Sequence, residues 1–417
     1  MRVLKIFSAY VACFFYIFNP PFSGLPVSPV KIFWVLSFVY IIKHGKILFF
    51  INKFKYEILI LIATTLLTIP VMLVNFNYAV HRLYLNVVFL IECFVASFYI
   101  INSFVGLNRE GRLEKIIFWT AITSALISII LLLNPDWSVY VRVNVLKDEL
   151  VNKYGLEGHL FRGFALAEGT TFSYGIACAL IFIMMYKVKG YEFFYIPSLL
   201  MIFVSIILNA RTGVVVVLYG LFVLALVDFK STLKKAAIFF SMIFFVSYLV
   251  LLGDFSQYER TINWIADFVI ELTTFTHGEA GGTIDVLTRE MLFFPRSMAE
   301  IFFGAGVNVY EQYDPRSDVG YVNQIYFGGV LYLTALLVMV FFMWYRLAFA
   351  RGQSLMAAIF FGSLLIVNFK GDSFNISTSF TRLISLYYVF YCLSTSRGGG
   401  VLSNAHFELK TPEADDK

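Results

Sequence analysis

The sequence predicts an all-α polytopic membrane protein with about twelve transmembrane helices. The 417-residue chain is 59% hydrophobic and only 14% charged, and a water-soluble protein of this length could not bury that much apolar surface. Its apolar residues form twelve runs of about the 20 residues that a spanning helix needs. Because a segment inside a bilayer must satisfy its own backbone hydrogen bonds, we expect each run to be a helix.

The first apolar run follows a basic N-terminus, as the apolar region of a signal peptide does. It lacks a small-x-small cleavage site and further apolar runs follow, so we interpret it as the first helix. The fourth carries Glu92 near its middle, and a carboxyl at that depth is either functional or a hydrogen-bonded packing residue that faces the bundle interior. The predicted spans are 3–19, 28–43, 56–75, 83–105, 115–133, 172–187, 193–209, 212–228, 236–253, 322–345, 354–369 and 379–395.

The loop charges predict the orientation, because Lys and Arg collect in short loops on the cytoplasmic side. With the N-terminus inside, sixteen Lys and Arg residues fall in the inner segments and five in the short outer loops. This bias predicts that both termini are cytoplasmic. The outer five are Lys31, Arg82, Arg211, Lys370 and Arg382.

Two long segments then face outward, at about 134–171 and 254–321. Within the second, apolar residues at helical spacing predict an amphipathic helix over 258–273 and a further helix over 284–303, interrupted near Pro295. We therefore divide the chain into a membrane domain, 1–393, and a polar cytoplasmic tail, 394–417, which is expected to be disordered.

Several function classes lack sequence support. All four cysteines fall inside predicted helices, so the outer loops contain no disulfide. The formal charge of +5 comes mostly from inner-loop Lys and Arg and does not indicate nucleic-acid binding. No HExxH motif, Cys/His cluster or P-loop is present, so the sequence predicts neither a metal nor a cofactor.

Charged residues gather where three segments enter the outer membrane interface. Guanidinium groups bind phosphate oxygens in a bidentate fork, and anionic lipid headgroups lie at that depth. A structural interpretation competes at each position, because a single Arg there commonly snorkels or forms an ion pair. Glu168 could pair with Arg162, Asp318 could be a turn or cap residue, and the tyrosines could belong to an aromatic belt or stack on sugar rings. The positions are Arg162, Glu168, Arg211, Arg289, Asp318, Tyr310, Tyr313 and Tyr321.

Four segments in order resemble the bacterial O-antigen and related polysaccharide polymerases, the Wzy family. RGFALAEGTTFSYG, from Arg162, resembles the family's Arg-to-Glu segment, with Gly169 in place of a proline; twelve residues, not ten, separate Arg162 from Gly175. LNARTGVVVVLYG resembles the short polar turn before a long apolar helix. DVLTREMLFFP resembles the large-loop helix that carries an Arg, and GAGVNVYEQYDPRSDVGYVNQIYFGG resembles the run that carries an Asp.

The resemblance implies a GT-C-like bundle with two longer periplasmic loops, in the bacterial inner membrane. It implies a metal-independent glycosyltransferase that transfers a growing glycan from undecaprenyl pyrophosphate to the non-reducing end of a new lipid-linked oligosaccharide unit at the periplasmic face. A chain-length regulator is a candidate further partner besides membrane lipid. In that reaction Arg211 and Arg289 would stabilise the leaving pyrophosphate, and Glu168 or Asp318 would accept the hydroxyl proton. The substrate-binding candidates are Arg162, Tyr321, Arg296 and Tyr313.

Two rival functions stay open. Ligases of similar topology carry a His near the end of the large loop, whereas SDVGYVNQ has none and His277 lies some forty residues earlier, which favours a polymerase. A lipid-linked oligosaccharide transporter or flippase would favour two matching halves with broken spans. The chain shows no such symmetry, and Glu92 is the one feature that supports this rival.

Overall fold

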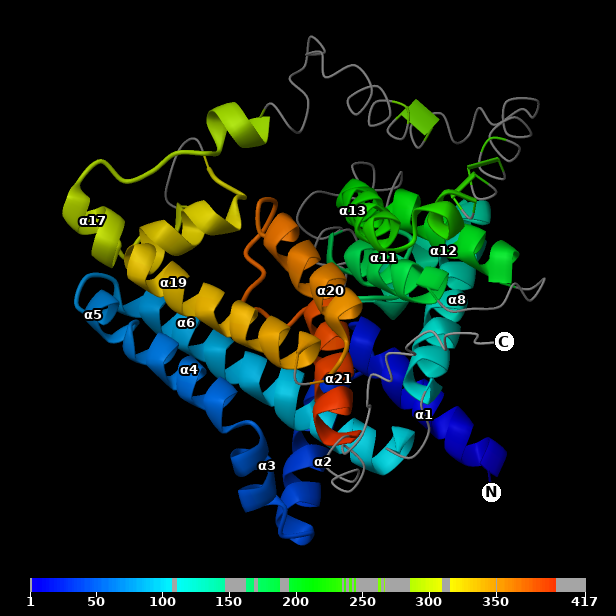
Figure 1. The fold of residues 1–417 in the computed structure, drawn as a ribbon, viewed down its shortest axis with the longest axis horizontal. Helices are drawn as coiled ribbons and strands as arrows, with labels where there is room; N and C mark the ends of the chain where they lie inside the picture. The colour runs from blue at the N-terminus through cyan, green and yellow to red at the C-terminus, as the bar shows by residue number, and fades with distance from the viewer. Residues whose placement is uncertain are drawn as a thin grey trace, which may run out of the picture.

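A computed structural model describes most of the chain, and in the described part the structure is almost entirely helical (Figure 1). No strand occurs there, and the one isolated bridge joins Phe22 to Leu146. The described ranges are 2–106, 111–146, 163–168, 172–187, 195–234, 286–309, 316–349 and 351–394, with a few single positions between 236 and 266.

Nearly every predicted run coincides with a helix; most of 236–253 lies outside the described residues. The π-helical stretches are labelled η. The elements are α1 (Arg2–Phe18), α2 (Pro29–Lys43), α3 (Ile47–Lys53), α4 (Lys55–Leu66), α5 (Ile69–Met72), α6 (Phe76–Phe89), η1 (Leu90–Ala96), α7 (Ser97–Ile100), η2 (Ile101–Val105), α8 (Arg112–Leu133), α9 (Pro135–Tyr140), η3 (Val141–Val145), α11 (Phe172–Lys187), α12 (Tyr195–Asn209), α13 (Arg211–Val227), η5 (Val286–Glu290), α17 (Met298–Phe303), α19 (Gly320–Ala348), α20 (Ser354–Val367) and α21 (Ser379–Ser394).

By length and composition, four described helical stretches could cross a membrane, or five if the bent pair α2 and α3 is one span. The axes of that pair differ by 108°. Other apolar helices are shorter, so the chain has the character of a membrane protein, while the count of twelve spans is not established by the helices themselves. The four stretches are Lys55–Met72, Phe76–Val105, Arg112–Leu133 and Gly320–Ala348.

Three segments expected to be loops are at least partly helical. The inner loop predicted between 43 and 56 contains α3, α6 begins at Phe76 rather than near 83, and the outer segment predicted over 134–171 begins with α9 and η3. Asn75 caps α6, because its side chain accepts a hydrogen bond from the Tyr78 amide at 3.2 Å. Arg82, counted as a loop charge, therefore lies buried inside a helix.

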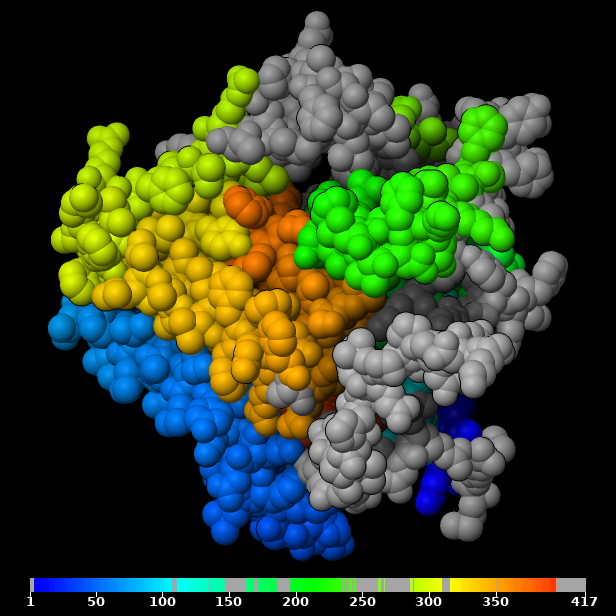
Figure 2. All heavy atoms as spheres, in the orientation of Figure 1, coloured from blue at the N-terminus to red at the C-terminus, as the bar shows by residue number. Residues whose placement is uncertain are grey.

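The bundle is built around α21, whose residues are almost all buried. It packs against α1, α7, α11 and η1, and Figure 1 shows α21 in the middle of the bundle. In Figure 2 the blue segment that contains α4 lies along the yellow α19 on the visible face, which agrees with the packing of α4 against α19. The C-terminal helix is therefore the element through which distant parts of the chain meet.

Helix α19 is broken inside its apolar run. Gly328 and Gly329 leave helical conformation, and Gly329 has a φ of 71°. The segment after α17 satisfies carbonyls at the break: Ala305 donates to Tyr326 at 2.9 Å and Gly306 donates to Phe327 at 3.2 Å. Irregular backbone at membrane depth is tolerated where protein buries it, and here the break is covered by the end of α17.

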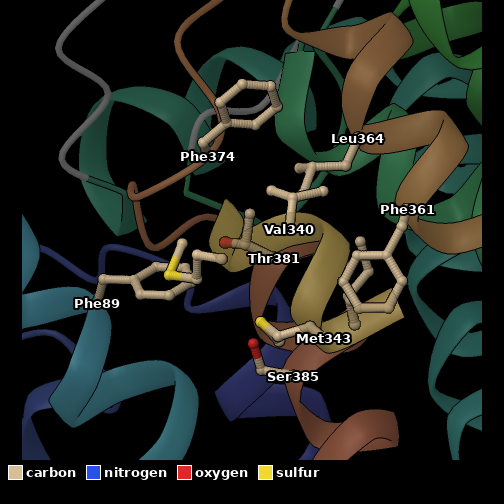
Figure 3. Close-up of a pocket in the computed structure, with 10 residues that line it drawn as sticks. Phe89, Val340, Met343, Phe361, Leu364, Phe374, Thr381 and Ser385 are labelled. Carbon is tan, nitrogen blue, oxygen red and sulfur yellow. The ribbon is translucent and has the colours of Figure 1, made fainter. Parts of the chain in front are cut away.

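The described part also contains a small cavity between α6, α19, α20 and α21 (Figure 3). Phe89, Met343 and Phe361 are among the side chains on its wall. Its walls are apolar apart from the hydroxyls of Thr381 and Ser385, which extend from α21. We interpret the cavity as a packing feature, since it offers no charged group to a substrate.

Candidate functional site

The helices bring several predicted site residues to one end of the bundle, which we call the Glu168 end. The starts of α11 and α13 are adjacent, because a Cβ at Gly175 would lie 2.5 Å from the Cβ of Ala210. The loop 368–378, between α20 and α21, lies over the same end, with Gly371 against the Phe172 ring. The start of α19 joins it through a hydrogen bond from the Gly320 amide to the Asn368 carbonyl at 2.9 Å.

A buried arginine is the centre of this end. Arg382, in the first turn of α21, is 1% exposed and donates to Oε2 of Glu168 from both terminal nitrogens at 3.2 Å. It also lies 3.4 Å from Oε2 of Glu92. We call Glu92, Glu168 and Arg382 the ion triad. One guanidinium therefore serves two carboxyl groups.

The two carboxylates have different surroundings. Glu92 lies in η1 and is 6% exposed, and its Oε1 accepts from the Trp34 indole at 3.1 Å. The Glu168 side chain is 50% exposed. Glu92 thus faces the bundle interior as a hydrogen-bonded and ion-paired residue, while Glu168 is the member of the triad that reaches an accessible surface.

Glu168 is fixed by the end of α1. Its amide donates to the Phe18 carbonyl at 2.8 Å, and its own carbonyl accepts from the Ser173 hydroxyl at 3.1 Å. The Asn19 amide group donates to its Oε2 at 2.6 Å. The short segment 163–168 therefore has a defined backbone position next to α1. Glu168 pairs with Arg382; Arg162, the partner considered from the sequence, lies outside the described residues.

A second buried ion pair anchors the loop 368–378. Arg82 of α6 pairs with Asp372 and donates to the Tyr78 hydroxyl at 2.7 Å. Gln324 of α19 donates to the other Asp372 oxygen at 2.6 Å. Every one of these groups is engaged within the protein, so this cluster holds α6, α19 and the loop together and thereby places the start of α21.

The remaining predicted residues approach from the large loop and α19. Asp318 forms a partly exposed ion pair with Lys370 at 3.6 Å. The Tyr321 hydroxyl donates to the Leu365 carbonyl at 2.8 Å, and its ring packs against Phe369, so both parts of this side chain already have partners in the protein. Its assignment to sugar binding stays a prediction.

The arginines of the large loop are exposed. Arg289 lies in η5, and the following Met291 carbonyl accepts from the Ser317 hydroxyl at 2.7 Å, which holds η5 beside Asp318. Arg296 lies between η5 and α17, in the interruption predicted near Pro295. Arg211 is half-buried at the first position of α13. Arg162, Tyr313 and most of the predicted amphipathic helix lie outside the described residues.

Sequence reasoning missed Arg382 and Asn19. Arg382 was counted as an outer-loop charge, yet it falls inside the predicted span 379–395. A buried carboxyl such as Glu92 needs a compensating partner, and a second charge inside a span was the available signal. For Asn19 the signal was weaker: Asn followed by two prolines at the end of a predicted helix.

No described group of three or more His, Cys, Asp or Glu side chains could hold a metal ion. Comparison with known proteins finds no matching family, no matching curated protein and no matching solved structure.

Proposed function

We propose that this chain is an O-antigen polymerase of the bacterial inner membrane, with twelve spans, both termini in the cytoplasm and the Glu168 end facing the periplasm. Its substrates are undecaprenyl-pyrophosphate-linked oligosaccharides, one as donor and one as acceptor. The chain transfers the growing glycan to the non-reducing end of the new unit.

One observation carries the proposal: segments that resemble polymerase motifs converge at the Glu168 end. Glu168, Arg211 and Asp318 each lie at or just before the start of a helix; the starts of α11 and α13 are adjacent, and the loop 368–378 joins the start of α19 to them. The segment that carries Arg289 is held beside Asp318 through the Ser317–Met291 hydrogen bond. This placement supports the proposal that residues from four distant segments act on one substrate.

The proposed chemistry is a group transfer. The bond between the anomeric carbon and the donor phosphate oxygen breaks, and a bond from the acceptor hydroxyl oxygen to that carbon forms. The lipid diphosphate leaves with increased negative charge, which Arg211, Arg289 and Arg162 stabilise more strongly in the transition state than in the ground state. Glu168 accepts the hydroxyl proton, since half of its side chain is exposed.

The test is elongation of a defined lipid-linked repeat unit by the purified protein. We expect wild type to form polymer and Arg211→Ala to form none at equal protein level. Arg289→Lys should also be impaired, because a point charge lacks the bidentate fork. Arg112→Ala, at the opposite end of the bundle, is the matched control and should retain activity. Wild-type polymer length from Arg211→Ala and Arg289→Ala would overturn these assignments.

The ligase alternative is separated by the phenotype of cells that lack the gene. Loss of a polymerase leaves lipid A capped with a single repeat unit, whereas loss of a ligase leaves the core bare. We expect the single unit. A bare core would replace the polymerase proposal with the ligase.

The ion triad and the break in α19 give a specific reason to test a transporter as the second candidate. Charges inside a bundle and broken helices line the substrate paths of many transporters. Vesicles that contain the purified protein decide between the two functions. Polymer formation without net movement of lipid-linked sugar supports the polymerase, and movement without polymer supports the transporter.

A further inference from the structure

The carboxylate of Glu168 is held by one oxygen only. Every contact that the structure gives its side chain uses Oε2: the Asn19 amide at 2.6 Å and both terminal nitrogens of Arg382 at 3.2 Å. The side chain is nevertheless half exposed. The held oxygen thus lies toward α1 and α21, and Oε1 is the oxygen presented to the accessible side.

Asn19 has an unusual backbone conformation that gives it this role. It is the one non-glycine residue with a positive φ, 42°, among the described residues. Asparagine tolerates this region better than most residues, but the conformation persists only where the surroundings enforce it. Here Asn19 is 2% exposed, and its Oδ1 accepts from the Val30 amide at 3.0 Å. That bond fixes the amide plane, so Nδ2 has one direction, toward Glu168.

Arg382 could not place Glu168 alone. Its guanidinium also faces Glu92 and donates to the Ile17 carbonyl at 3.2 Å and the Ser377 hydroxyl at 3.5 Å, so its position is a compromise among four acceptor residues. The hydrogen bond from Asn19 to Glu168, at 2.6 Å, is shorter than those from Arg382, and its donor is a neutral amide. It therefore selects one Glu168 conformer without adding charge.

We propose that Asn19 is a positioning residue that holds Oε2 of Glu168, so that Oε1 is aimed at the acceptor hydroxyl. This inference rests on the proposed polymerase function and on Glu168 as its proton acceptor. It assigns the C-terminal end of α1, which carries none of the resembling segments, to the transfer step.

The variant Asn19→Asp isolates the contact. Aspartate also tolerates positive φ and keeps an oxygen for the Val30 amide, but it replaces the donor to Glu168 with a second acceptor. We expect kcat for elongation to fall about 10- to 100-fold, because a displacement of about 1 Å at a reacting group has costs of this order. KM for the lipid-linked unit should stay within about twofold, since uniform substrate binding is not changed.

Asn19→Gly is the second variant, which keeps the backbone conformation and removes the amide group. Asn102→Asp is the control, because its amide donates to the Phe98 carbonyl at 2.8 Å in η2, toward the opposite end of the bundle. We expect Asn19→Gly to lose kcat like Asn19→Asp, and Asn102→Asp to resemble wild type. The inference is overturned if Asn19→Asp keeps the wild-type kcat, or if its KM rises by as large a factor as its kcat falls.

A double-mutant cycle separates this inference from the proposed function. If wild type does not elongate the unit, the function fails and the inference fails with it. If wild type elongates and Glu168→Gln retains full kcat, the proton-acceptor assignment fails. If Glu168→Gln is impaired, adding Asn19→Asp should reduce kcat no further, because both changes act through one carboxylate. If the double variant instead loses kcat by the product of the two single-variant factors, Asn19 acts through a group other than Glu168.

Discussion

At the scale of the residue, Glu92 shows how charge is managed in this bundle. A carboxylate that is 6% exposed would lose several kcal/mol of hydration, by the usual order of magnitude for buried ions. The Arg382 guanidinium and the Trp34 indole replace that hydration at 3.4 and 3.1 Å. Because Arg382 is itself buried, each member of the pair is stable only in the presence of the other.

This dependence predicts the effect of Arg382→Ala. The substitution leaves Glu92 without its cation, and breaking a buried pair in this way costs about 3–5 kcal/mol of the free energy of unfolding. The double variant Arg382→Gln with Glu92→Gln removes both charges and should recover part of the loss. Unfolding midpoints of the purified proteins in one detergent provide the measurement. An unchanged midpoint for Arg382→Ala would contradict a stabilising ion triad.

The sequence made Glu92 conspicuous but could not reveal its partner. Glu92 and Arg382 are 290 positions apart, and Asn19 and Glu168 are 149 apart. Hydropathy places each residue in or beside a helix, yet it does not say which helices are neighbours. The contacts of the candidate site depend on packing between distant helices, and a single sequence contains no direct record of that packing.

At the scale of the element, the apolar runs predicted the helices for two reasons that agree. Apolar side chains favour a membrane-embedded segment, and such a segment satisfies its own backbone hydrogen bonds as a helix. They did not predict irregularities within helices. The π-helical η1 holds Glu92, and the α19 break is signalled only by the pair Gly328 and Gly329. Such features depend on which neighbours supply replacement hydrogen bonds, as the segment after α17 does here.

The α19 break can be tested with two glycines that both have a positive φ. Gly329 has a φ of 71° with a ψ of −173°, a region almost confined to glycine, and Gly352 has a φ of 65°, so Ala at either position costs on the order of 1–3 kcal/mol from backbone conformation. Only Gly329 also abuts backbone, that of Phe302 and Phe303, whereas Gly352 faces open space. We expect Gly329→Ala to lose about 1–3 kcal/mol more than Gly352→Ala, the usual cost of overpacking. Equal unfolding midpoints would rule out the close approach.

At the scale of the whole molecule, the two ends of the bundle differ in chemistry. The Glu168 end combines buried ion pairs with exposed arginines and a half-exposed carboxylate. At the opposite end, Glu57 of α4 pairs with Arg346 of α19 and accepts from the Tyr388 hydroxyl of α21, which ties three helices together. Among the described residues, the Glu168 end combines the resembling segments with accessible charges, so the proposed function requires that end to face the periplasm.

That orientation can be tested independently of any activity. The four native cysteines are all buried, so a single introduced cysteine can be labelled selectively. Trp137, 64% exposed after α8, lies at the Glu168 end, and Gly352 lies in an exposed turn at the opposite end. A membrane-impermeant thiol reagent should label Trp137→Cys in intact spheroplasts and Gly352→Cys only after permeabilisation. The reverse pattern would place the guanidinium groups in the cytoplasm, where they could not act on a periplasmic lipid diphosphate.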